Sequence, residues 1–276
     1  MTGQSERRRI IVSGASRGIG LRSAIALADA GFDVLAGVRS PSDAHRIDAL
    51  GIRALSPVTL DITSAADIAG LSDMLHAERV FGLVNNAGIA ALGPLEFLPL
   101  EDIREQFEVN VFGHIAMIQA FLPQLRESHG RIVNIGSISG IVGFPFFGAY
   151  AASKFALEGL SDSLRRELRP TGVTVSLVQP GNIDTDIWET SIAAGQSLEE
   201  SMSGDARQVY GRRFSRNANG SYGPATKSAP EKVASAVVEA MTASAPRARY
   251  LVGKDARRLA RMRRFLSDAL LDKRLG

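Results

Sequence analysis

The stretch from Arg9 to Gly20, RIIVSGASRGIG, joins a short apolar run to three glycines and then to a helical pattern. Gly14, Gly18 and Gly20 let the backbone turn tightly and approach a ligand closely, because glycine has no Cβ. A helix over Ile19–Ala30 would point its first N–H groups and its positive dipole end at a phosphate. The stretch therefore predicts the first βαβ unit of a dinucleotide-binding domain, although glycine-rich turns also serve packing alone. The predicted phosphate-binding residues are Gly14, Ser16, Arg17, Gly18, Ile19 and Gly20.

The rest of the chain alternates apolar runs of strand length with segments of helical period. Continuous Val/Ile/Leu runs are typical of strands buried on both faces, as in a parallel sheet covered by helices. Their alternation with helices predicts a single α/β domain with a doubly wound parallel sheet, the Rossmann fold. The predicted strands are residues 9–13, 32–38, 57–62, 80–86, 131–137, 173–181 and 249–253. The predicted helices include residues 42–50, 65–77, 100–126, 150–169 and one that begins at Pro230.

This regular alternation stops after Gly181. Residues 182–229 are rich in Ser, Gly, Asn and Arg, and a weakly patterned stretch of this length predicts a substrate lid. We expect residues 8–181 to hold the cofactor-binding and catalytic core, and residues 230–276 to form a helix, a strand and a basic tail. The tail is predicted as one amphipathic helix from Asp255. Its apolar stripe would consist of Leu259, Met262, Leu266 and Leu270.

The composition is that of an ordinary globular domain, with 276 residues, 45% of them apolar and 22% charged. The chain has no cysteine, which excludes disulfides and thiolate zinc sites. Four histidines without ligand spacing predict surface or capping positions and no metal site. No run approaches the eighteen apolar residues of a membrane span, and we expect a cytoplasmic protein. The histidines are His45, His76, His114 and His129.

The net charge of +3 is unevenly distributed, because ten Lys/Arg face three Asp/Glu from Arg247 onward. We interpret this basic tail as a solvated helix face whose Leu/Met stripe packs on the body or on a neighbouring subunit. No aromatic residues are interleaved with the arginines, and three aspartates dilute the charge. We therefore expect neither nucleic-acid binding nor membrane contact.

Two arginines stand where a preference between NAD and NADP is decided. NAD-binding domains place a carboxylate about 20 residues after the glycines, where it binds the ribose 2′-hydroxyl. The second strand ends instead in Val38-Arg39, and Arg17 lies inside the glycine loop. Two guanidinium groups suit the 2′-phosphate of NADP, because they form charge-assisted and often bidentate hydrogen bonds. The pattern favours NADP(H) over NAD(H), unless both arginines are simply solvated.

The stretch Gly148–Leu160, GAYAASKFALEGL, contains a candidate proton-transfer pair. Tyr150 and Lys154 are four residues apart, so they share one helix face. A phenol has an ordinary pKa of about 10, and a nearby cation lowers that pKa by favouring the phenolate. Taken alone, the pair is better interpreted as two polar side chains on the exposed side of a helix. Ser137, thirteen residues earlier, and the glycine loop together favour a catalytic site.

Together these residues resemble the short-chain dehydrogenase/reductase family, over nearly the whole chain up to about residue 190. The resemblance implies a Rossmann fold and a hydride transfer between a nicotinamide cofactor and a carbonyl or alcohol carbon. The residues that carry it are Gly14, Gly18, Gly20, Asp61, Asn85, Asn86, Ala87, Gly88, Asn110, Ser137, Tyr150, Lys154, Pro180 and Gly181.

The resemblance also assigns cofactor contacts. It implies that Asp61 holds the adenine amino group, although capping of the helix after Thr63-Ser64 is an alternative. Asn85 would be structural, while the residues that follow it line the cofactor. Thr185 would bind the carboxamide of the nicotinamide. The further cofactor-binding residues implied in this way are Asn86, Ala87, Gly88, Pro180, Gly181, Tyr150 and Lys154.

Four residues acquire catalytic roles from the same resemblance. Tyr150 would give a proton to the carbonyl oxygen during reduction, or take one from the alcohol during oxidation. Lys154 would hold the nicotinamide ribose and tune the tyrosine, and Ser137 would hydrogen-bond the substrate oxygen. Asn110 would anchor a water that connects the lysine to solvent.

The sequence around the tyrosine and the late stretch RARYLVGKDARRL look most like the hydroxysteroid and retinol dehydrogenases of this family. That likeness implies a bulky apolar alcohol or ketone as substrate, with Trp188 or one of Phe144, Phe146 and Phe147 lining its pocket or serving core packing. One alternative is a 3-oxoacyl thioester reductase, and another is a protein that senses NADP(H) without catalysis. The family habit implies a homodimer or homotetramer.

Overall fold

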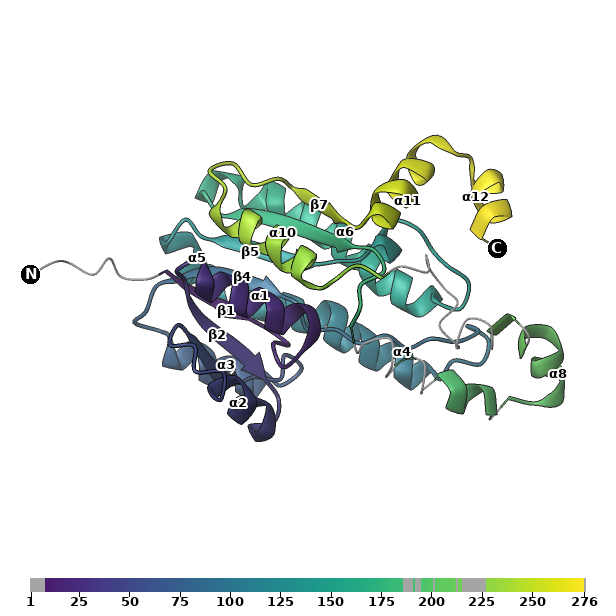
Figure 1. The fold of residues 1–276 in the computed structure, drawn as a ribbon, viewed down its shortest axis with the longest axis horizontal. Coiled ribbons are helices and arrows are strands. Elements are labelled where there is room, and N and C mark those ends of the chain that lie inside the picture. The colour runs from purple at the N-terminus through teal and green to yellow at the C-terminus, as the bar shows by residue number, and fades with distance from the viewer. Residues whose placement is uncertain are drawn as a thin grey trace, which may run out of the picture.

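The computed structural model describes residues 8–185, 191, 195–200, 202–211, 213–214 and 227–275. These residues form one parallel sheet of seven strands in the order β3-β2-β1-β4-β5-β6-β7, as the alternation of strands and helices predicts (Figure 1). The strands are β1 Arg9–Val12, β2 Asp33–Val38, β3 Leu55–Thr59, β4 Val80–Asn85, β5 Arg131–Ile135, β6 Thr174–Pro180 and β7 Arg249–Val252.

Helices cover both faces of the sheet and bury one apolar cluster against each. One cluster joins the strands to Leu27 of α1 and Val237 of α10, and Figure 1 shows these two helices in front of the sheet. The other joins them to Leu71 of α3, Phe121 of α5 and Leu164 of α6. The helices are α1 Gly18–Asp29, α2 Pro41–Asp48, α3 Ala65–Met74, α4 Leu100–Phe107, α5 His114–Glu127, α6 Gly148–Glu167, α8 Gly204–Ala206, α10 Glu231–Thr242, α11 Lys254–Phe265 and α12 Asp268–Leu275.

The order of the strands creates a crevice at their carboxyl ends. The chain proceeds outward from β1 to β2 and β3, and then returns to the other side of β1 with β4. The connections that follow β1 and β4 therefore diverge, and ligands of open α/β sheets bind in the space between them. The glycine loop follows β1 and the Asn86-Ala87-Gly88 turn follows β4, so the topology brings both predicted cofactor segments to this crevice.

The long helix predicted over residues 100–126 is not regular throughout. Between α4 and α5 the chain makes a π-helical turn, η1, over Glu108–Gly113. π-Helical turns are rare and occur mostly at functional sites. This one contains Asn110, whose side chain is fully buried.

The tail predicted as one helix from Asp255 is two helices. Leu266 has an extended backbone, with φ −101° and ψ 146°, and ends α11 before α12 begins at Asp268. This break turns Leu271 inward, where it is only 5% exposed, and leaves Leu270 51% exposed. The predicted stripe is therefore wrong, because the apolar residue that packs on the body lies one position later than a continuous helix would require.

The lid predicted over residues 182–229 falls partly outside the described residues, and Trp188 lies there. Its described portion includes α8 and a second π-helical turn, η4, at Arg207–Gly211. Phe214 and Met202 from this portion pack with Phe97 and Phe146 of the body. In the described part of the chain, no helix has the length and apolar character needed to cross a membrane.

Candidate active site

The glycine loop after β1 is held by close backbone contacts. Gly14 has φ +62°, and a Cβ added there would lie 2.7 Å from the Cα of Ala87. Gly18 also has a positive φ, of +54°. A Cβ at Gly20 would collide with the carbonyl oxygen of Gly14 and with the side chain of Asn86. Gly14 and Gly20 are thus required by the packing of this loop against the turn after β4, and Gly14 and Gly18 by their left-handed backbone conformation.

Asn86 holds the glycine loop through its side chain. Its Nδ2 donates to the carbonyl oxygens of Ser13 at 3.0 Å and Gly14 at 2.9 Å. In return, Ser13 Oγ accepts from the N–H groups of Asn86 and Ala87 at 3.0 and 3.2 Å. The side chain expected to line the cofactor therefore shapes the loop that would hold it. Asn85 is structural, as expected, since its Nδ2 donates to Asn134 Oδ1 at 3.0 Å.

Arg39 and Asp61 lie together at the carboxyl ends of β2 and β3. Burial opposes the ionisation of Asp61, but hydrogen bonds from Thr63 and the charge of Arg39 lower the pKa of this carboxyl below its usual value. The alternative role of Asp61 as a helix cap is wrong. Ser64 caps α3 by accepting from the N–H of Asp67 at 3.2 Å, whereas Asp61 Oδ1 accepts from Thr63 N and Oγ1.

The predicted catalytic side chains come together in a buried group. Ser137, Tyr150 and Lys154 are 7%, 6% and 4% exposed. Lys154 Nζ lies 5.8 Å from the centre of the Tyr150 ring and donates to the carbonyl oxygen of Ile135 at 3.0 Å. A Cβ at Gly88 would lie 3.8 Å from the same Nζ, so this ammonium faces the turn after β4. The exposed helix corner considered as an alternative is therefore wrong.

Burial dominates the protonation of this pair. Desolvation raises the pKa of Tyr150 to about 12, against a smaller lowering by a hydrogen bond with the Ser137 side chain. Desolvation also lowers the pKa of Lys154 to about 8. The sequence favoured a phenol pKa lowered by the lysine. In the structure the opposite holds, because both groups are removed from water.

Three polar side chains form a ladder along the helix that contains η1. Gln106 Oε1 accepts from Ala91 N at 2.6 Å, and Asn110 exchanges two hydrogen bonds of 2.9 Å with the backbone of Ile89. His114 Nε2 lies 2.8 Å from the carbonyl oxygen of Ala87, to which it must donate. Burial and the charge of Lys154 lower the pKa of His114 to about 3, so this imidazole is neutral. The ladder fixes the segment 87–91 beside Lys154.

Two of these ladder residues, Gln106 and His114, were not predicted as site residues from the sequence. His114 is fully buried, so its predicted surface or capping position is wrong. His45, His76 and His129 are exposed, as predicted. The available signal was the spacing of four residues from Gln106 to Asn110 and again to His114, which places all three on one helix side. In the described part of the chain, no His, Asp and Glu side chains cluster as metal ligands would.

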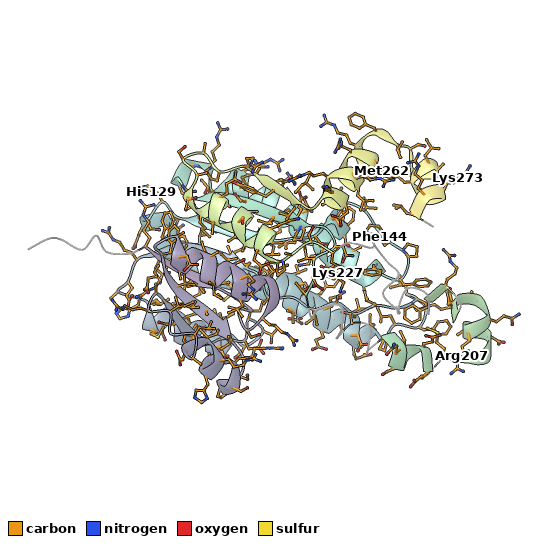
Figure 2. All side chains as sticks on the ribbon, in the orientation of Figure 1. His129, Phe144, Arg207, Lys227, Met262 and Lys273 are labelled. Atoms are coloured by element: carbon orange, nitrogen blue, oxygen red, sulfur yellow. The ribbon has the colours of Figure 1, made fainter. Side chains whose placement is uncertain are left out.

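The segment after β6 folds back over the glycine loop. A Cβ at Gly18 would lie 3.4 Å from the Thr185 methyl group, so the predicted pyrophosphate and carboxamide contacts converge. Ser228 accepts from Asp184 N and donates to Asn182 O, both at 2.9 Å. Next to it, Lys227, labelled in Figure 2, forms a 3.1 Å ion pair with Asp184.

Aromatic and aliphatic side chains surround the Tyr150 ring. Phe147 and Leu92 pack with it, and Ala90 and Phe144 lie against this cluster. Phe146, with a left-handed backbone at φ +68°, points instead to Phe214, at a ring separation of 5.3 Å. The phenylalanine-rich loop thus supplies the apolar side chains beside the phenol, and it also supplies Phe146, on which the described part of the predicted lid packs.

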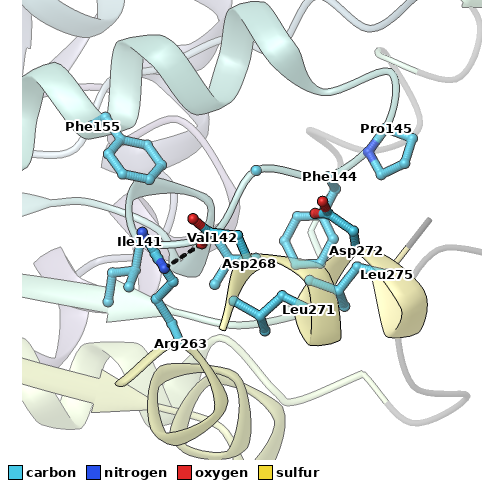
Figure 3. A pocket seen from close by; sticks show the side chains of 11 residues that line it. Ile141, Val142, Phe144, Pro145, Phe155, Arg263, Asp268, Leu271, Asp272 and Leu275 are labelled. Carbon is cyan, nitrogen blue, oxygen red and sulfur yellow. Dashed lines mark hydrogen bonds and ion pairs between the residues drawn. The ribbon is translucent and has the colours of Figure 1, made fainter. Parts of the chain in front are cut away.

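The far side of the same loop faces the C-terminal helices across a cavity of about 510 Å³ (Figure 3). Phe144, Val142 and Phe155 line the cavity from the body, and Leu271 and Leu275 line it from α12. An ion pair of 2.9 Å between Arg263 and Asp268 closes the turn between α11 and α12. Phe144 therefore lies between this cavity and the apolar cluster around Tyr150.

Comparison with known proteins agrees with this arrangement. The model of the short chain dehydrogenase family matches residues 8–195. A 3-amino-tetrahydro-pyrrolizinone reductase from Xenorhabdus hominickii is 35% identical, over 97% of this chain and 94% of the reductase. Retinol dehydrogenase 5 from Mus musculus is 34% identical, over 95% of this chain and 86% of its own.

Solved structures of similar proteins show the same fold with either nicotinamide cofactor. A short-chain dehydrogenase from Burkholderia cenocepacia in complex with NADP superimposes with a TM-score of 0.77 and 28% identity, over 99% of this chain and all of its own. One from Burkholderia phymatum in complex with NAD gives 0.79 and 25%, over 98% and 97%. The buried Tyr150–Lys154 pair, the glycine loop and these likenesses agree, and the chain belongs to the short-chain dehydrogenase/reductase family of NAD(P)-dependent oxidoreductases.

Proposed function

We propose that the protein is an NADP(H)-dependent reductase or dehydrogenase of an apolar carbonyl or alcohol. The observation that carries the substrate class is the apolar wall around the buried Tyr150 phenol, formed by Phe147, Leu92, Ala90 and Phe144. Pockets for small molecules are mostly apolar, with a few polar groups that orient the ligand. Here the phenol and the Ser137 hydroxyl are those groups.

The nicotinamide supplies the hydride of the reaction when it is bound. Tyr150 donates its phenolic proton to the carbonyl oxygen, and Ser137 hydrogen-bonds the same oxygen. Lys154, held at Ile135 and facing the turn after β4, stabilises the phenolate left behind and would hold the nicotinamide ribose. The Asn110 amide is committed to Ile89 and Ser153, so its backbone carbonyl is the group that would anchor a water near the lysine.

The raised pKa of Tyr150 keeps the phenol protonated, which is the form that reduction requires. With a pKa raised to about 12, the Tyr150 phenol carries its proton at neutral pH and can act as an acid. Lys154, with a pKa of about 8, is still mostly charged at that pH. Oxidation needs the phenolate and should gain as the pH rises.

Arg39 supports the choice of NADP(H). Its charge reaches the Asp61 carboxyl, so it stands at the adenosine end of the crevice, and the adjacent Val38 carries no carboxylate. Arg17, the residue before α1, lies in the glycine loop and is exposed. Guanidinium groups such as these two suit a 2′-phosphate, because they form charge-assisted hydrogen bonds with it.

The site residues, the lid and the assembly carry over from the sequence as parts of this proposal. The residues that we assign to the cofactor are those of the glycine loop and of the turn after β4, Arg39, Asp61, Tyr150, Lys154, Pro180, Gly181 and Thr185. Residues 182–229 serve as the lid, and the protein works in the cytoplasm as a homodimer or homotetramer. Contacts of the described lid with Phe97 and Phe146 support the lid assignment.

One panel tests the function against its alternatives. Purified protein is given NADPH or NADH with steroid, retinoid, aliphatic and acyl-thioester carbonyls, and cofactor oxidation is followed by absorbance. We expect turnover with NADPH on bulky apolar ketones or aldehydes. Turnover confined to acyl thioesters would favour the 3-oxoacyl reductase. Nucleotide binding without turnover on any member of the panel would favour the sensor.

A further inference from the structure

The strands β6 and β7 end side by side against one carboxylate from the next helix. Gly181 N donates to Val252 O at 2.9 Å, and this hydrogen bond joins the residue after β6 to the last residue of β7. α11 starts directly behind β7, and Asp255 in its first turn accepts from Asn182 N through Oδ2 at 2.6 Å. This hydrogen bond is short and charge-assisted, which places it among the stronger kinds.

Two glycines show how closely the carboxylate is enclosed. A Cβ at Gly181 would collide with both carboxylate oxygens of Asp255, and a Cβ at Gly253 would collide with Oδ1. Gly253 also has φ +111°, a backbone conformation that side chains rarely adopt. Both glycines thus leave room for Asp255 rather than for a ligand. The place of Asp255 in the first turn of α11 also puts its negative charge at the positive end of the helix dipole.

The anchored residue, Asn182, lies between Gly181 and Thr185, two of the residues proposed to contact the cofactor. Asn182 is bound on its N–H side by Asp255 and on its carbonyl side by Ser228. Three residues later, the Thr185 methyl group faces Gly18 in the glycine loop. Loss of the Asp255 contact would leave an N–H unpaired and let the segment 181–185 move relative to the glycine loop.

The geometry points to Asp255 as a positioning residue for the nicotinamide end of the cofactor, acting through the backbone of Asn182. This inference rests on the proposed function, because it takes the segment 181–185 as a cofactor contact. Asp255 sets the distance between this segment and the glycine loop, and it does not shape the adenosine end near Arg39. The stretch RYLVGKDARRL, which no catalytic assignment uses, thereby gains a role.

The experiment compares a whole dinucleotide with its adenosine fragment. Titrations of wild type, Asp255→Ala and Asp255→Asn with NADPH and with 2′,5′-ADP, or with NADH and ADP if the wild type prefers them, give two dissociation constants for each protein. We expect Asp255→Ala to weaken dinucleotide binding about tenfold, as loss of a charge-assisted hydrogen bond would, and to change fragment binding less than about twofold. Asp255→Asn keeps an acceptor oxygen and should lose less.

Asp268→Ala is the matched control, since Asp268 is also an acidic residue in the first turn of a tail helix but is exposed and pairs with Arg263. It should leave both constants unchanged. Equal weakening of dinucleotide and fragment, or no weakening in either Asp255 variant, would overturn the inference while the proposed function stands. Should Asp255→Ala fold poorly by thermal melting, the ratio measured for Asp255→Asn decides. A wild type that binds neither dinucleotide overturns the proposed function itself.

Discussion

At the carboxyl ends of β1 and β4 the chain contacts itself mainly through backbone atoms and short side chains, whereas the loop after β5 makes its contacts through aromatic rings. Gly14 lies against the backbone of Ala87, and Gly20 lies against Gly14 and Asn86. Phe146 and Phe147, by contrast, reach in different directions to the lid and to Tyr150. In the first region an added methyl group would collide with the backbone, so the residue at each position is fixed. In the second region we expect only the size and the apolar character of the side chain to matter. We expect substitutions to act differently in the two.

The largest expected effect lies where the two regions meet. Tyr150→Phe removes the phenolic O–H and keeps the ring in its apolar cluster. Turnover should fall about 100- to 10,000-fold, the weight of general acid catalysis, while dinucleotide affinity and melting temperature stay near wild type. Tyr250→Phe makes the same change on β7, where the hydroxyl accepts from Arg247 N, and should retain activity. Full turnover by Tyr150→Phe would remove the proton-transfer assignment.

Gly20→Ala tests the backbone-packed region. The added methyl group would collide with Gly14 O and Asn86 Nδ2, and overpacking of this kind typically costs about 1–3 kcal/mol. Dinucleotide affinity measured by titration should therefore fall about tenfold or more. Gly148→Ala is the control. Gly148 is the first residue of α6, next to the aromatic loop, and nothing lies within 4 Å of a Cβ added there, so dinucleotide affinity should not change. Unaltered binding by Gly20→Ala would show that the loop adapts.

Arg39→Asp tests charge in the same region. The substitution exchanges a donor to a 2′-phosphate for an acceptor from a 2′-hydroxyl, so the ratio of kcat/KM for NADPH to that for NADH should fall about 10- to 100-fold. Arg53→Asp introduces the same change before β3, at the amino ends of the strands, and should leave the ratio unchanged. An unchanged ratio in Arg39→Asp would mean that this guanidinium serves only Asp61.

Phe146→Ala should have the smallest effect, because the aromatic region tolerates changes of shape. Loss of the ring contacts with Phe214 and Tyr210 removes about 0.5–1.5 kcal/mol per pair. We expect KM for a bulky apolar carbonyl to rise about three- to tenfold without a change in KM for the cofactor. Phe265→Ala, at an exposed ring on α11, is the control. An equal rise in KM for the cofactor would contradict the proposed separation of the two regions.

The same contrast explains which features the sequence could predict. The glycine loop and the Tyr150–Lys154 pair are recognisable because glycine and helix spacing impose local geometry. The hold of Asn86 on the glycine loop and the burial of His114 were not predicted, because each depends on a partner far away in the chain. The phenol pKa was missed for a similar reason, since desolvation depends on how fully the surrounding segments enclose Tyr150. The break between α11 and α12 was not predicted either, because Leu271 is buried by segments distant in the sequence, beside a cavity that Phe144 also lines.

The polar ladder of Gln106, Asn110 and His114 also requires the repeat of a helix to match the repeat of the segment beside it. Four residues of helix rise about 6 Å, while two residues of extended chain advance about 6.6 Å, so every fourth helical side chain can meet every second residue of the segment 87–91. In a regular α-helix, however, such side chains rotate by about 40° at each step and leave the segment. The looser winding of Glu108–Gly113 counters this rotation. Removing a single residue there would make the helix more regular and put the ladder out of phase with the segment that it holds.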